Sequence, residues 1–122
     1  RSHIEAHDRG INYTSKKLVE AGVEVIYAPF RDADEIYKMA TEEDVGMIGI
    51  SCSATNPLYV ISELTKLLEE KKAKFSIILG GVIPSINIPR LKEMGIKEVF
   101  GPGSDPNAIV TFVKEMLNKE AD

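Results

Sequence analysis

The sequence predicts an α/β domain of three layers, a flavodoxin-like or Rossmann-like fold in which helices cover both faces of a parallel sheet. Two observations predict it. Segments with apolar residues at helical spacing alternate along the chain with short β-branched runs. The run at residues 45–50 is apolar on both faces, which is typical of a strand that helices cover from both sides. The length of 122 residues suits a single domain, which we take as residues 1–122.

The first half of the chain begins with a polar loop that leads into a helix. Gly22 suits the left-handed position that stops this helix, and a strand is expected at residues 23–27, ended by Pro29. Asp32 followed three residues later by Glu35 resembles a capping box, so a second helix should start there.

The second half alternates strands with helices. Asn87 is expected to cap a short helix that carries Pro89 in its first turn and stops at Gly95. Asp105 should cap the last helix, with Pro106 as its first residue. The strands expected in this half span residues 45–50, 75–79 and 97–100.

The strand that should open the sheet is missing from this pattern. A sheet of order 2-1-3-4-5 begins with a strand before its first helix, whereas this sequence begins in the loop that should follow that strand. We expect that the chain is the remainder of a longer one, or that another segment fills the slot between the strands at residues 23–27 and 45–50. Direct pairing of those two strands would contradict this expectation.

Composition excludes several classes of partner. The net charge is −4, and the 15 Lys and Arg residues are scattered among 19 acidic residues, so we expect no nucleic-acid partner. No apolar run approaches the roughly 18 residues that a membrane span needs, so we expect no membrane partner. The single cysteine, Cys52, fits a reducing cytoplasm.

A ligand in such a sheet binds outside the carboxyl ends of the strands, where four loops should meet. Three of the loops are rich in small residues that let a ligand approach the backbone, although each alone could be an ordinary turn. No GxGxxG pattern or P-loop follows a strand. His7 could act as a base for a nucleophilic Cys52, but an unreactive thiol is the simpler interpretation. The four loops are residues 1–9, 51–56, 80–85 and 101–104.

Three stretches of these loops resemble the DxHxxG, SxL and GG motifs of cobalamin-binding domains: residues 5–10, 51–53 and 80–81. The resemblance is strongest to the C-terminal domain or small subunit of methylmalonyl-CoA mutase and related acyl-CoA mutases. It covers nearly the whole chain, because five segments follow in the same order: His-Asp-Arg-Gly, the expected strand Glu-Val-Ile-Tyr, Gly-Gly-Val-Ile-Pro, Leu-Lys-Glu-Met-Gly and Phe-Gly-Pro-Gly.

The resemblance implies that cobalamin binds in the base-off, His-on mode. His7 would be the lower axial ligand of cobalt, and Glu5 would accept a hydrogen bond from the other ring nitrogen. Ser51 would bind the benzimidazole, and Gly80 with Gly81 would line the pocket of the nucleotide tail. The full set of expected cofactor-binding residues is Glu5, His7, Asp8, Arg9, Gly10, Ser51, Ser53, Gly80, Gly81, Gly101 and Gly103, with His7 as the metal ligand and no catalytic residue.

The sequence departs from the family motifs at two positions. Glu5 stands where the family has Asp, which places the carboxylate one methylene farther from the backbone. Ser53 stands where the family has Leu, which removes an apolar contact to the tail.

The function that the resemblance implies is the cobalamin-binding subunit of an adenosylcobalamin-dependent acyl-CoA mutase. The expected partner is a large TIM-barrel subunit, without which this chain should bind the cofactor but turn over nothing. Two alternatives stay open: a corrinoid carrier for methyl transfer, and a structural subunit with a vestigial site. A homo-oligomer stays open as well.

Overall fold

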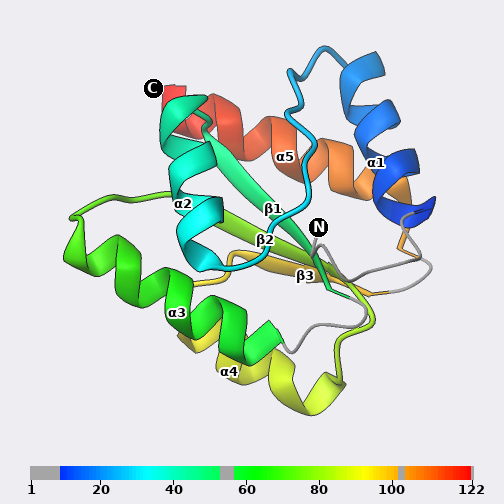
Figure 1. The fold of residues 1–122 in the computed structure, drawn as a ribbon. Coiled ribbons are helices and arrows are strands. Elements are labelled where there is room, and N and C mark those ends of the chain that lie inside the picture. The colour runs from blue at the N-terminus through cyan, green and yellow to red at the C-terminus, as the bar shows by residue number, and fades with distance from the viewer. Residues whose placement is uncertain (1–8, 53–56, 102–103, 122) are drawn as a thin grey trace.

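A computed structural model describes residues 9–52, 57–101 and 104–121, and it shows a parallel sheet between two layers of helices (Figure 1). The three described strands are β1 (Met47–Cys52), β2 (Ser76–Gly81) and β3 (Glu98–Phe100), in the order β1-β2-β3. The described helices are α1 (Arg9–Glu20), α2 (Ala33–Glu42), α3 (Pro57–Glu70), α4 (Ile88–Glu93) and α5 (Pro106–Ala121), with a 3-10 turn, η1, at Ser85–Asn87.

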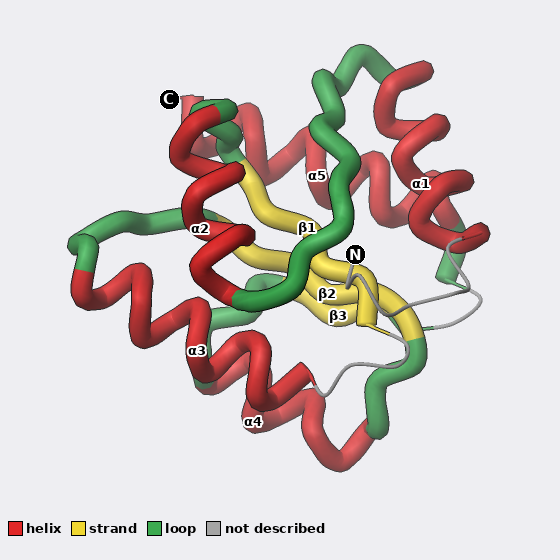
Figure 2. The backbone as a smooth tube through the Cα atoms, in the orientation of Figure 1, coloured by secondary structure: helices red, strands yellow, loops and turns green. Residues whose placement is uncertain are grey.

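The register of the sheet aligns the carboxyl ends of its strands. Ser51 of β1 lies opposite Gly80 of β2, and Gly80 lies opposite Phe100 of β3, so these residues form one row across the sheet. Helices connect consecutive strands, as parallel pairing requires. The tube in Figure 2 shows the three strands side by side, and the arrows in Figure 1 show that they run in the same direction. The predicted fold class is therefore confirmed.

One face of the sheet carries the main hydrophobic core. Alternate residues of β1 and β2 point to this face because side chains of a strand alternate between faces. They pack under α2, α3 and α4, where Ile61, Leu64 and Leu91 have no exposed surface. The core consists of Phe30, Ala33, Ile36, Ala40, Ile48, Ile50, Val60, Ile61, Leu64, Leu68, Ile77, Leu79, Leu91 and Ile96.

The opposite face, which α1 and α5 cover, is packed more thinly. Ile78 of β2 and Val113 of α5 are buried there, but Gly49, Ser51 and Gly80 occupy neighbouring positions of the same face. Among the side chains that the structure describes, none in the main core belongs to α1 or α5. Because two of these three strand residues lack a side chain and the third has a small one, space remains between the sheet and the two helices.

The capping box of α2 and the glycines that end α1 and α4 agree with the sequence predictions. The N–H of Glu35 donates to Asp32 Oδ1 at 3.0 Å, and the N–H of Arg31 donates to the Glu35 carboxylate at 3.2 Å. Gly22 and Gly95 have φ values of +93° and +105°, as expected where a helix ends in a left-handed residue. These local signals set the helix boundaries.

Two predictions were wrong. Residues 23–27 form no strand: they lie outside every described ladder, and only Phe30 makes an isolated bridge nearby. A β-branched run becomes a strand only when a neighbour pairs with it, and no described strand lies beside this one. Asn87 makes no side-chain cap to α4, because it ends the turn η1 with α-type backbone angles instead.

The described part of the chain contains no helix that is both long and apolar enough to cross a bilayer.

Candidate functional site

The ends of β1, β2 and β3 open into a cavity of about 840 Å³. Its volume lies within the roughly 300–1,000 Å³ range of small-molecule sites. It lies on the thinly packed face of the sheet, and α1 and α5 form its outer wall. The residues that line its rim are Ser51, Gly80, Gly81, Val82, Phe100, Gly101, Ser104 and Pro106.

Four of the predicted site residues therefore meet at one place. Ser51, Gly80, Gly81 and Gly101 come from the ends of three different strands, and the parallel register brings them to the same edge. Ser51 is half-buried, so its hydroxyl can donate or accept a hydrogen bond at the rim without full exposure to water.

Arg9 and Gly10 begin α1, so the helix includes the last residue of the predicted loop 1–9. The other predicted residues, Glu5, His7, Asp8, Ser53 and Gly103, lie outside the described part of the chain.

Gly80 provides the clearest test of whether a ligand fits the rim. A Cβ built on Gly80 would lie 3.6 Å from the Phe100 carbonyl oxygen, an ordinary van der Waals contact. The protein itself therefore has room for a methyl group here, and a glycine at this position leaves the backbone open to a ligand. Gly81 differs, because its φ of +111° is one that other residues rarely adopt.

Phe100 is a rim residue outside the predicted ligand loops, and Ser104 belongs to the predicted loop 101–104 but not to the set of expected cofactor-binding residues. The Phe100 ring contacts Phe112 of α5 edge to face, with 5.9 Å between ring centroids, and this contact joins β3 to the outer helix. The Ser104 hydroxyl donates to the Gly101 carbonyl at 2.7 Å and closes the turn between them. Phe100 is identified as a rim residue by its position opposite Gly80 in the sheet. This pairing is known only once the sheet is known, so the sequence alone does not reveal it.

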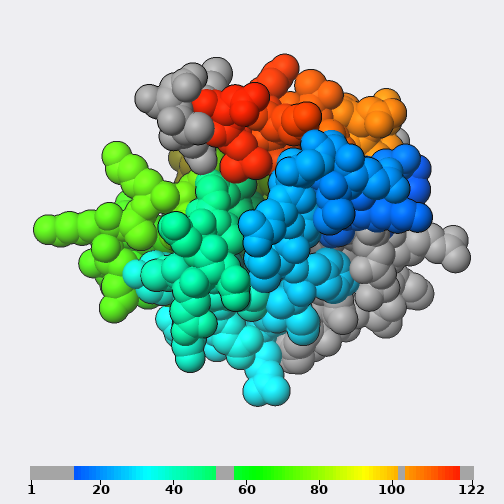
Figure 3. Space-filling model, turned by 90° about the horizontal axis from the view of Figure 1, so that it is seen from above, coloured from blue at the N-terminus to red at the C-terminus, as the bar shows by residue number. Residues whose placement is uncertain are grey.

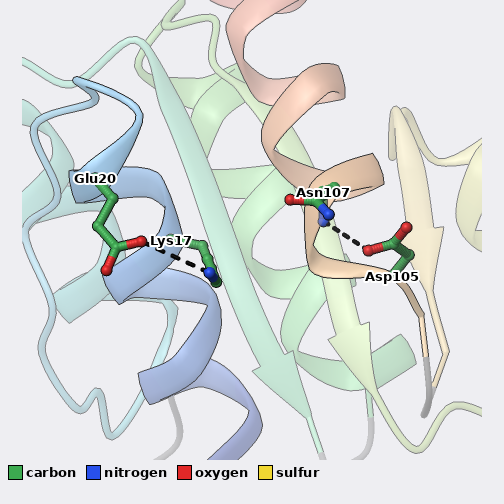
Figure 4. A network of polar contacts seen from close by, with 4 residues as sticks. All are labelled: Lys17, Glu20, Asp105 and Asn107. Carbon is green, nitrogen blue, oxygen red and sulfur yellow. Dashed lines mark hydrogen bonds and ion pairs between the residues drawn. The ribbon is translucent and has the colours of Figure 1, made fainter.

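The outer wall of the cavity begins at the first turn of α5. Asp105 Oδ1 accepts a hydrogen bond from the Asn107 N–H at 2.9 Å, which caps α5 as the sequence predicts (Figure 4). On the neighbouring α1, Lys17 pairs with Glu20 at 3.7 Å. The rim residues themselves carry no charge among those described, so this end of the cavity suits a neutral aromatic or amide group.

A cation centre is not formed by the described residues alone, because they contain no group of three or more His, Cys, Asp or Glu side chains that could hold an ion.

Comparison with known proteins gives one consistent match. Residues 2–111 match the family described as B12 binding domain. The chain is 36% identical over 117 residues to the pivalyl-CoA mutase small subunit of Xanthobacter autotrophicus, covering 95% of this chain and 79% of that protein. It is 31% identical to the 2-hydroxyisobutanoyl-CoA mutase small subunit of Aquincola tertiaricarbonis, covering 93% of this chain and 85% of that protein. It is 30% identical to methylmalonyl-CoA mutase of Escherichia coli, covering 93% of this chain and 16% of that protein.

Proposed function

The chain belongs to the family of B12-binding domains, and on that premise we propose that it is the cobalamin-binding subunit of an adenosylcobalamin-dependent acyl-CoA mutase. The observation that carries the proposal is the row Ser51, Gly80 and Phe100, which opens into a cavity large enough for a small-molecule group. Two relatives that are small subunits of acyl-CoA mutases, each covered over most of its length, support the mutase over a methyl carrier.

The rim residues have the properties that a nucleotide tail requires. Ser51 would donate to or accept from the benzimidazole, and Gly80 with Gly81 would contact the tail through backbone. His7 would bind cobalt through one imidazole nitrogen while Glu5 accepts from the other, which fixes the tautomer. Bound cobalamin supplies a cobalt–carbon bond whose cleavage starts radical rearrangements, and this chain contributes only the binding and orientation of that group.

The catalytic partner would dock on the same rim. Val82 and Ile86 follow β2 and are 62% and 84% exposed, although both are large apolar residues. Exposed apolar residues beside a ligand site are typical of a surface that a second protein covers. We therefore propose that the large mutase subunit covers the corrin from this side, with Val82 and Ile86 at the contact.

Titration with hydroxocobalamin tests the proposed site. We expect the visible spectrum of a base-off, His-on corrinoid, which His7→Ala should abolish. The matched control is His3→Ala, because His3 is the other histidine of the chain and stands outside the motif. An identical spectrum in the wild type and both variants would show that His7 does not bind cobalt.

The departures from the family motif give a second test. Glu5→Asp combined with Ser53→Leu should tighten cobalamin binding. The first substitution restores the side-chain length that the family has beside His7, and the second restores an apolar contact to the nucleotide tail. Unchanged affinity would show that neither residue contacts the cofactor or its ligand.

A further inference from the structure

Gly49 is exposed although it stands in the middle of β1. Its neighbours in the strand, Ile48 and Ile50, are only 8% and 3% exposed and belong to the main core. Gly49 faces the opposite side of the sheet, because successive residues of a strand alternate between faces, and there it lines the large cavity. The middle of β1 therefore has one covered face and one open face.

The register of the sheet places Gly49 one step below the rim. Ser51 follows two residues later on the same face, which is a distance of about 6.6 Å at 3.3 Å per residue. Ile78 pairs with Gly49 as Gly80 pairs with Ser51, so Gly49 and Ile78 form the next row down from the rim. Both residues line the same cavity as the rim, and we call this pair the floor.

The described part of the protein does not itself require a glycine at position 49. Gly49 does not have a positive φ, so its backbone conformation is open to other residues. Among the described residues, a Cβ built on Gly49 would meet only the Ile78 side chain within 4 Å, at 3.7 and 3.9 Å, which are ordinary van der Waals contacts. A glycine inside a strand also costs stability relative to alanine. A glycine of this kind often marks a place where a ligand approaches closely.

The space over Gly49 lies on the face of the sheet and not at the edge of β1. α1 and α5 cover this face side by side (Figure 3). Leu18 of α1, with Ile109 and Val113 of α5, belongs to the cavity wall that these helices form. Because Ile78 in the floor is apolar as well, the space over Gly49 suits a flat apolar group.

We propose that Gly49 is a specificity-determining residue, which leaves room on the floor for the far end of the base in the nucleotide tail. This inference rests on the proposed function, in which Ser51 binds a nitrogen of the dimethylbenzimidazole. That base is a flat pair of fused rings with its nitrogens at one end and its two methyl groups at the other. The step from Ser51 to Gly49 is close to the length of the two rings, so the methyl end lies against the floor.

Three corrinoids test the proposal on the chain as it is. Hydroxocobalamin carries the dimethylbenzimidazole base, its analogue with unsubstituted benzimidazole lacks both methyl groups, and cobinamide lacks the whole tail. Absorbance titrations give the affinity of each for the wild type and for Gly49→Ala. We expect the variant to bind hydroxocobalamin at least about fivefold more weakly, because an extra methyl group forced into a filled site weakens binding about 5- to 150-fold. The benzimidazole analogue should lose less than about twofold, because it leaves room for the new methyl group, and cobinamide should lose nothing.

Two further variants separate binding from folding. Gly49→Val places a larger side chain on the floor and should weaken both corrinoids that carry a tail. Ile48→Val shortens a side chain of the same strand on the opposite face, so it should lower the midpoint of urea unfolding and leave all three affinities unchanged. Gly49→Ala itself should unfold at a midpoint equal to or above that of the wild type.

The outcomes for wild type and variant distinguish this inference from the proposed function. A wild type that binds hydroxocobalamin and a Gly49→Ala variant that binds it equally well would refute the role of Gly49 alone. Equally weakened binding of both tailed corrinoids would also overturn it, because the methyl groups would then lie away from the floor. A wild type that binds no corrinoid would refute the proposed function and this inference together.

Discussion

The substitution Gly80→Ala should change ligand affinity without lowering the stability of the free chain. The new methyl group would lie 3.6 Å from the Phe100 carbonyl oxygen, and Gly80 does not have a positive φ, so the free chain accommodates it. A compatible Gly→Ala change restricts the unfolded chain and stabilises a protein by about 0.4–1 kcal/mol. We therefore expect a free energy of unfolding equal to or slightly above that of the wild type.

The same methyl group would occupy the space proposed for the nucleotide tail. Forcing an extra methyl group into a filled site costs about 1–3 kcal/mol, which corresponds to an affinity about 5- to 150-fold weaker. Gly80→Val should weaken binding further, because it adds two more methyl groups at the same place. Gly81→Ala is a poor substitute, because the φ of +111° would strain the chain whether or not a ligand is bound.

The assay compares two corrinoids by their absorbance changes on binding. Hydroxocobalamin carries the nucleotide tail, whereas cobinamide lacks it, so Gly80→Ala should weaken the first and leave the second unchanged. Urea unfolding of each variant verifies that the fold is intact. Equal affinity of wild type and variant for hydroxocobalamin would refute the proposal that the nucleotide tail contacts Gly80. Equally weakened binding of both corrinoids would show that the new methyl group disturbs the contact with the corrin ring and not with the tail.

Three further predictions concern the fold. Leu64→Ala should lower the free energy of unfolding by about 2–5 kcal/mol, because Leu64 has no exposed surface; a loss below about 1 kcal/mol in urea unfolding would contradict its place in the core. Lys72 has a φ of +54°, so Lys72→Gly should stabilise the chain by about 1 kcal/mol, and a lower midpoint in the same assay would contradict this. Glu98 accepts hydrogen bonds from the Val99 N–H at 3.0 Å and from Lys92 at 3.2 Å, and these bonds hold the pKa of its carboxyl below the ordinary value of 4.5 despite partial burial. A lowered pKa stabilises the folded chain above the ordinary pKa, and this contribution is lost as pH falls through the folded value. Glu98→Gln should therefore flatten the acid limb of a stability–pH curve, and an unchanged slope below pH 5 would show that Glu98 does not contribute to it.

Local signals in the sequence identified the helices well. Asp32, Asp105 and the glycines at helix ends interact only with residues within four positions of their own. The local sequence therefore determines where these helices begin and end. The strands predicted at residues 45–50 and 75–79 are present as Met47–Cys52 and Ser76–Gly81, so both continue two residues past the apolar runs that predicted them.

Features that depend on distant partners were not predictable in this way. The run at residues 23–27 has the composition of a strand, but pairing is decided by what lies beside it in space. Phe100 joined the rim only through its register opposite Gly80, which involves residues about twenty positions apart. The predicted loop carrying His7 lies outside the described residues, so its role as a cobalt ligand stays a prediction.

The unequal packing of the two faces of the sheet has a consequence for how the molecule opens. The layer of α2, α3 and α4 shares one continuous core with the strands, whereas α1 and α5 mainly contact each other and border a cavity. Local unfolding takes place where few apolar contacts must be broken. The layer of α1 and α5 should therefore detach from the sheet at a lower free energy than the other helices. A molecule that fills the cavity would contact both this layer and the sheet, and it would raise the free energy needed to separate them.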